Sequence, residues 1–253
     1  MICRMSEAGG HVRRTVVKDE VRSRFLPEGE RAVRVYLPPG YQEWLSYPVV
    51  YCQDGEDFFN FGRIATFAQR LILEEDWEPF VIVGVDVDKA KRTAEYAPDG
   101  ERHSAYVRFF GEELIPAMES RYAVRRAPGE RVLAGDSLGA AASLSVALAY
   151  PDRCRRILSL SGAFYGSSQT MLRQAGELSG LAVWMTVGLG ETAFESELGT
   201  FDIVALNRTA RTLLERKGAR VLYSERPGEH KWGFWQSVLP EALAAFLGPN
   251  AEL

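Results

Sequence analysis

Cysteine and histidine are scarce in this sequence, and both shortages exclude kinds of site. The three cysteines, at positions 3, 52 and 154, form no C-x-x-C pair and are odd in number. This pattern disfavours a disulfide framework and indicates buried or free thiols. The three histidines, at positions 11, 103 and 230, show no H-x-H or H-x-x-x-H spacing. We therefore predict that the protein binds no metal, and the sequence indicates no other cofactor.

Long apolar runs and charge of one sign are also lacking. No run approaches the roughly 20 residues that a membrane-spanning helix needs, and the opening MICRMSEAGGHVRR has no apolar stretch of signal-peptide length. We therefore expect a cytoplasmic protein without a membrane partner. The net charge is −4, and basic clusters such as RRAPGER (125–131) are short and interrupted by acidic residues. This charge pattern disfavours a nucleic-acid partner.

The remaining composition is that of an ordinary globular protein, with 253 residues of which 46% are hydrophobic and 25% are charged. The chain shows no internal repeat, low-complexity tract or linker, so we expect residues 1–253 to form a single domain. Short apolar runs predict strands, because several are continuous, as buried strands are. These runs lie at 31–39, 48–54, 80–86, 131–136, 155–162, 182–188 and 219–225.

Apolar residues at three- and four-residue spacing predict helices between and after these strands. They lie at 138–149, at 205–217 and in a last stretch around Trp235, where Pro240 predicts a late start or a kink. Strands alternating with helices indicate an α/β fold with a mainly parallel sheet covered on both faces. Residues 11–37, with a turn at LPEGE (26–30), predict two antiparallel strands at one edge instead.

A serine between two glycines marks the end of one predicted strand. Gly135, Ser137 and Gly139 give the G-x-S-x-G spacing, after the run RVLA and directly before a predicted helix. On such a sharp strand-to-helix turn the serine hydroxyl is exposed at the positive end of the helix. The next amide, that of Leu138, would point to where an oxyanion develops. Chance also produces this spacing, but the strand before it and the helix after it favour a catalytic nucleophile.

A histidine and a carboxylate would complete the chemistry. A serine hydroxyl needs a base, and His230 follows the last predicted strand in the turn-rich segment RPGEHKWGFW. In the order Ser…Asp/Glu…His, the orienting acid lies between 138 and 229. Glu191, just past the end of the strand at 182–188, is our choice. The other candidates for the acid are Glu195, Glu197 and Asp202. The competing interpretation is that the carboxylates of this segment only form a solvated acidic loop.

Five ordered segments resemble the putative-esterase family of α/β-hydrolases, which includes enterochelin esterases, S-formylglutathione hydrolases, feruloyl esterases and mycolyltransferases. The resemblance covers most of the chain, from RAVRVYLPPGY (31–41) to the last helix. It implies the α/β-hydrolase fold. The segments are VVYCQDGEDFF (49–59), VGVDVDKAKRTAEYAP (83–98), AGDSLGAAASLSVALAYPDRC (134–154), VGLGET (187–192) and PGEHKWGFWQSVLPEAL (227–243).

The resemblance also implies roles for single residues. Ser137 would be the nucleophile, His230 the base and Glu191 the orienting acid. The loop around Gly55 and Glu56 would supply a second oxyanion amide beside that of Leu138. One departure bears on the acid: the stretch between Glu191 and the helix expected near 205 is longer than the family pattern.

Two further groups are candidates to contact the substrate. The resemblance places Arg92 and Glu95 near the substrate cleft, and a structural salt bridge is the competing interpretation. Several aromatic residues are candidates either to line an acyl or aryl pocket or simply to fill the core. They are Phe58, Phe59, Trp77, Phe164, Tyr165, Trp232 and Trp235.

The sequence therefore predicts a serine esterase that hydrolyses a small-molecule ester through an acyl-enzyme. Acyl transfer to an alcohol or thiol would use the same residues, and remains an alternative. A non-catalytic binding protein on a hydrolase fold is a second alternative. The presence of both Ser137 and His230 argues against it.

Overall fold

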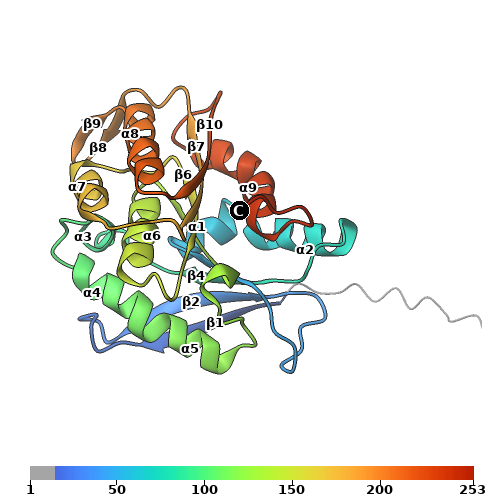
Figure 1. Ribbon diagram of the computed structural model, residues 1–253. Helices are drawn as coiled ribbons and strands as arrows, with labels where there is room; N and C mark the ends of the chain where they lie inside the picture. Colours follow the sequence, from blue (N-terminus) through green and yellow to red (C-terminus); the bar gives the residue numbers. More distant parts are fainter. Residues whose placement is uncertain (1–14) are drawn as a thin grey trace, which may run out of the picture.

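The computed structural model describes residues 15–253, which form an eight-stranded sheet with helices on both faces (Figure 1). The strand order is β1-β2-β4-β3-β5-β6-β7-β10, and the strands from β4 to β10 run parallel to one another. The protein has the α/β-hydrolase fold that the sequence predicted. The strands are β1 (Thr15–Arg22), β2 (Glu30–Leu37), β3 (Val49–Cys52), β4 (Val81–Val85), β5 (Arg131–Asp136), β6 (Arg156–Leu160), β7 (Ala182–Gly188) and β10 (Arg220–Arg226).

The antiparallel edge is confirmed over the described residues. β1 and β2 pair from Thr15↔Leu37 to Arg22↔Glu30, and β2 is also antiparallel to β4. The turn between β1 and β2 forms where LPEGE predicts it, because Gly29 adopts φ +79° and the Ser23 hydroxyl accepts the amide of Leu26 at 2.9 Å. Residues 11–14 of the expected first strand lie outside the described residues.

Two apolar layers hold the helices against the sheet, one on each face. One layer packs α3 to α8 against the strands, and the other packs α1, α2 and α9 (Figure 1). The helices are α1 (Gly55–Asn60), α2 (Ile64–Glu74), α3 (Arg92–Tyr96), α4 (His103–Arg108), a π-helical turn (Phe109–Leu114), α5 (Ile115–Arg121), a 3₁₀ turn (Pro128–Glu130), α6 (Leu138–Ala149), α7 (Gly166–Gln174), α8 (Ile203–Arg216) and α9 (Trp232–Leu247).

The last helix differs from the expectation of a late start. α9 begins at Trp232 and continues through Pro240 to Leu247. Proline removes one helical hydrogen bond, but Trp235, Leu239 and Leu243 on either side of it are buried in the apolar layer. Their packing maintains the helix across the proline, so that His230 is followed directly by helix.

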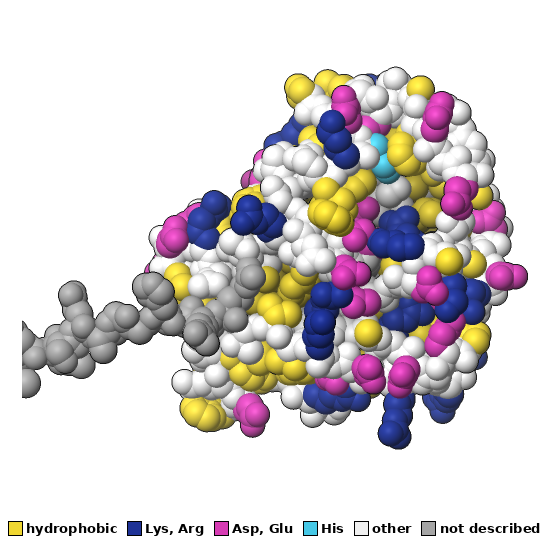
Figure 2. All heavy atoms as spheres, turned by 180° about the vertical axis from the view of Figure 1, so that it is seen from behind, with side chains coloured by type: hydrophobic (Ala, Val, Ile, Leu, Met, Phe, Trp, Pro, Cys, Tyr) yellow, Lys and Arg dark blue, Asp and Glu magenta, His cyan; other side chains and the backbone are white. Residues whose placement is uncertain are grey.

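The surface fits the charge pattern of the sequence. Basic and acidic side chains are interspersed over the face shown in Figure 2. No helix among residues 15–253 is both long and apolar enough to cross a bilayer.

Candidate active site

Ser137 occupies a strained turn between β5 and α6. Its backbone has φ 51° and ψ −122°, a conformation that non-glycine residues rarely adopt. The flanking glycines make this turn possible. A Cβ on Gly135 would overlap the carbonyl group of Gly139, and a Cβ on Gly139 would lie 3.1 Å from the Gln53 side chain. The G-x-S-x-G spacing thus arises from close packing of strand, helix and the loop after β3.

A chain of hydrogen bonds joins Ser137 to a carboxylate. The Ser137 Oγ lies 2.9 Å from His230 Nε2, and His230 Nδ1 lies 2.6 Å from Glu191 Oε2. All three residues sit beyond the carboxyl ends of strands, after β5, β10 and β7 respectively. The three residues come together because functional groups of parallel sheets gather at this edge, although β6 separates β5 from β7 in the strand order.

Glu191 is itself fixed on its second oxygen. Its Oε1 accepts the Ser161 hydroxyl at 2.7 Å and the Gly188 amide at 2.8 Å. Trp235 Nε1 in turn donates to Ser161 Oγ at 2.8 Å. The carboxylate is buried, so these donors replace water and leave Oε2 to face the imidazole.

The other three candidate acids lie elsewhere. Asp202 caps α8, where its Oδ1 accepts the Ala205 amide at 2.9 Å. Glu195 and Glu197 are exposed on or beside a short strand, β8 (Phe194–Ser196). Of the four carboxylates, the structure brings Glu191 to His230.

The candidate oxyanion amides begin two helices. Leu138 is the first residue of α6, and Gly55 and Glu56 open α1. Amides in the first turn of a helix have no acceptor within it. The preceding amide, that of Asp54, donates to the Tyr96 hydroxyl at 3.0 Å, and the Glu56 side chain turns away to Arg34.

Arg92 joins the loop of α1 to the serine turn. Its Nε and Nη2 each bind one oxygen of Asp54 at 2.7 Å, and Nη2 also donates to the Asp136 carbonyl at 3.3 Å. Asp54 directly precedes Gly55, and Asp136 lies two residues before Leu138. Burial raises the pKa of Asp136 to about 7, with a further rise from Asp54 and an opposing effect of Arg92.

Glu95 and Trp232, also expected near the substrate, have other neighbours. Glu95 is fully buried, and its carboxylate binds Arg31 at 2.8 and 2.9 Å and Arg102 at 3.1 Å. Glu95 thus forms a buried salt bridge, but with Arg31 and Arg102, whereas Arg92 binds Asp54. The Trp232 ring packs edge-on against Phe58 and against Trp235, with centroid distances of 5.0 and 5.4 Å.

A cavity of about 230 Å³ opens onto Ser137. Its walls come from three places: the serine turn with Tyr165, the start of α3, and a β-hairpin of β8 with β9 (Gly199–Phe201). The lining residues are Arg92, Thr93, Ser137, Leu138, Tyr165, Phe194, Ser196, Glu197 and Leu198. The hairpin lies in the long segment after Glu191, and neither it nor Phe194 was predicted from the sequence.

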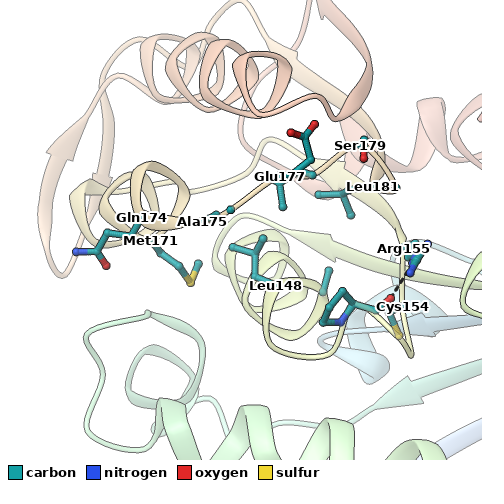
Figure 3. Close-up of a pocket in the computed structure, with 14 residues that line it drawn as sticks. Leu148, Cys154, Arg155, Met171, Gln174, Ala175, Glu177, Ser179 and Leu181 are labelled. Carbon is teal, nitrogen blue, oxygen red and sulfur yellow. Dashed lines mark hydrogen bonds between the residues drawn. The ribbon is translucent and has the colours of Figure 1, made fainter.

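A larger cavity of about 680 Å³ lies at the opposite end of α6 from Ser137 (Figure 3). Leu148 and Cys154 line one side of it, and Met171 and the segment from Ala175 to Leu181 line the other. Burial raises the pKa of the Cys154 thiol to about 12, so this cysteine is held as an unreactive thiol.

Comparison with known proteins identifies the family. Residues 25–246 match the family described as "Putative esterase". The chain belongs to this family. As a member of the putative-esterase family it is a carboxylic ester hydrolase. The YjcH protein of Bacillus subtilis (strain 168) is 33% identical over 235 residues, which cover 92% of this chain and 98% of YjcH.

Solved structures share the fold of this putative esterase at low identity. A ferulic acid esterase is 19% identical with a TM-score of 0.78, and the match covers 94% of this chain and 99% of that one. The enterobactin esterase FES from Shigella flexneri is 18% identical with a TM-score of 0.73, covering 92% of this chain and 60% of FES. These likenesses establish the α/β-hydrolase fold.

Proposed function

We propose that this protein hydrolyses carboxylic esters through an acyl-enzyme formed on Ser137. The observation that supports this most directly is the continuous hydrogen-bonded chain from Ser137 through His230 to Glu191, at 2.9 and 2.6 Å. In this arrangement the serine acts as nucleophile, the histidine as base and the glutamate as orienting acid.

The first half of the reaction forms the acyl-enzyme. The Ser137 oxygen attacks the ester carbonyl carbon while His230 Nε2 accepts its proton, and the carbonyl oxygen becomes an oxyanion. Glu191 accepts a hydrogen bond from Nδ1 of His230 and stabilises the imidazolium that results. When the tetrahedral intermediate collapses, the imidazolium gives its proton to the leaving alcohol oxygen, and the C–O bond of the ester breaks.

The second half repeats these steps with water. His230 removes a proton from a water molecule that attacks the acyl carbon, and then returns a proton to the Ser137 oxygen as the carboxylic acid leaves. Ester and water together supply every atom of the two products.

We assign the oxyanion site to the amides of Leu138 and of Gly55 or Glu56. One such donor is worth about 3–4 kcal/mol of transition-state stabilisation in comparable enzymes. Arg92 supports the assignment, because its bonds to Asp54 and Asp136 tie together the segments that carry these amides. Arg92 is therefore a positioning residue that also borders the substrate cavity.

The remaining candidates receive different roles in this proposal. Glu95, buried between Arg31 and Arg102, acts as their structural counter-ion. Trp232 remains a candidate to line an acyl or aryl pocket, since it packs on Trp235, whose ring lies 4.9 Å from that of His230.

The test compares Ser137→Ala with Ser120→Ala, a matched change at an exposed serine on α5. We expect Ser137→Ala to abolish hydrolysis of p-nitrophenyl acetate and labelling by a fluorophosphonate, and Ser120→Ala to retain both. Turnover that survives Ser137→Ala would refute the proposal. Wild-type protein that takes no label would instead indicate a binding protein. Partition of the acyl group to an added alcohol or thiol would indicate acyl transfer.

A further inference from the structure

The β8–β9 hairpin is a small element attached to the catalytic groups. Phe194 pairs with Phe201, Glu195 with Thr200 and Ser196 with Gly199, so that only Glu197 and Leu198 form the turn. Isolated two-stranded hairpins are marginally stable in water. The conformation of this one therefore depends on what its side chains contact.

Two aromatic contacts hold the hairpin, and they are made by its first and last residues, Phe194 and Phe201. The Phe194 ring lies on the imidazole of His230, with centroids 3.9 Å apart, and the Phe201 ring lies 4.3 Å from that of Tyr165. Phe194 and Phe201 are partners in the hairpin register. The open end of the hairpin is thus fixed against His230 and Tyr165 by two aromatic contacts.

The turn of the hairpin borders the cavity beside Ser137. Ser196, Glu197 and Leu198 line this cavity together with Ser137 and with the residues that begin α3. With the hairpin in this position the cavity measures about 230 Å³. Sites for drug-sized ligands occupy roughly 300–1,000 Å³, so the room beside Ser137 is small.

The lining indicates which half of an ester this cavity receives. His230 must protonate the leaving alcohol, so the alcohol lies beside its Nε2. Among the described residues that line the cavity, Leu138 and Tyr165 are present but His230 is not. Phe194, which lines the cavity, lies on the imidazole of His230, so the cavity borders the base as well as Ser137. We place the acyl chain in it because the acyl group is the half of the ester that becomes bonded to the Ser137 oxygen.

We propose that the β8–β9 hairpin makes this enzyme selective for esters of short acyl chains, with Leu198 at its turn as the residue that limits chain length. This inference rests on the proposed function. Leu198 is half-exposed, so its replacement by a smaller side chain would leave no cavity in the core.

Three variants test the proposal. In the first, Asn-Gly replaces residues 195–200, which leaves Phe194 and Phe201 paired across a two-residue turn of the type that hairpins favour. The second is Leu198→Ala. The matched control is Thr200→Ala, an exposed position on the same hairpin that does not line the cavity. Circular dichroism and thermal unfolding establish that each variant is folded.

The measured quantity is the ratio of kcat/KM for p-nitrophenyl octanoate to that for p-nitrophenyl acetate. We expect the wild-type ratio to be below one tenth, and the shortened hairpin to raise it at least tenfold. Leu198→Ala should raise it about threefold or more, and Thr200→Ala should leave it unchanged. A wild type that prefers octanoate, or a folded shortened variant with the wild-type ratio, would overturn the proposal.

A second readout separates this proposal from the function on which it rests. Ethyl and octyl fluorophosphonates phosphonylate Ser137 with loss of fluoride, whether or not an ester is turned over. If esters are not hydrolysed but the shortened hairpin selectively speeds labelling by the octyl reagent, the esterase function fails and the size limit holds. If neither reagent labels Ser137, both proposals fail.

Discussion

Replacement of Glu191 by glutamine should prevent His230 from acting as a base, although the imidazole stays in place. Oε1 receives two donors, the Ser161 hydroxyl and the Gly188 amide. The glutamine oxygen must therefore occupy that position, which leaves its NH₂ group facing His230 Nδ1. Nδ1 then has to accept a hydrogen bond, so the neutral imidazole carries its proton on Nε2. In that tautomer Nε2 faces the Ser137 oxygen with a proton and cannot act as its base.

The expected loss follows from this change of tautomer. The equivalent amide substitution in serine-protease triads lowers kcat by about 10⁴-fold, or about 5 kcal/mol of transition-state stabilisation. We expect a decrease in kcat/KM of about 10³- to 10⁴-fold for Glu191→Gln, with little loss of stability because the buried group becomes neutral and keeps its donors. The assay is p-nitrophenyl acetate hydrolysis at pH 7.5, with thermal unfolding of the same samples.

Asp202→Asn is the matched control, since Asp202 is the rival acid nearest the next helix. Asparagine caps helices about as well as aspartate, so this variant should keep both the wild-type rate and the wild-type stability. A folded Glu191→Gln enzyme with more than a tenth of the wild-type kcat/KM would show that Glu191 does not orient His230. A large loss of activity in Asp202→Asn would reassign the acid.

Three further perturbations test the surroundings of Ser137. Gly135→Ala should lower the free energy of unfolding in urea by about 3 kcal/mol or more, because its Cβ overlaps Gly139; a neutral effect would contradict the close packing. Arg92→Lys should lower kcat at least tenfold with KM nearly unchanged, because an ammonium cannot reproduce the planar bidentate contact with Asp54; an effect on KM alone would make Arg92 a substrate-binding group. Asp136 has a pKa raised from 3.8 to about 7 in the folded state, so it binds a proton that the unfolded chain releases, and its contribution to stability is lost as pH rises across that interval. Asp136→Asn should therefore flatten the pH dependence of unfolding between about pH 4 and pH 7, and an unchanged slope would refute this.

The sequence located Ser137 and His230 because local patterns define them. Glycines on both sides of a serine, after a buried strand and before a helix, specify a turn whose geometry depends on neighbouring residues. His230 follows the last strand, and strand ends in a parallel sheet converge. Both inferences needed only the order and type of the elements.

The choice among Glu191, Glu195, Glu197 and Asp202 could not be made in this way. The four carboxylates fall within a short segment that lacks helical or strand periodicity. Glu191 reaches His230 because β7 and β10 pair in parallel and the Gly190 amide donates to the carbonyl of Gly228 at 2.9 Å. That register is a contact between distant parts of the chain. The sequence did not predict the β8–β9 hairpin for a similar reason. Its strands are short, and the rings that Phe194 and Phe201 contact, those of His230 and Tyr165, are distant from them in sequence.

By itself, the sequence determined the alternation of strands and helices, the serine turn and the histidine that follows the last strand, because each is encoded by residues close together in the chain. The tertiary structure decided which carboxylate lies beside His230, how Arg92 joins two loops, and how little room remains beside Ser137. Those properties depend on distances between segments that meet only when the sheet assembles, and burial then sets their electrostatics. Local residue patterns carry no measure of such distances.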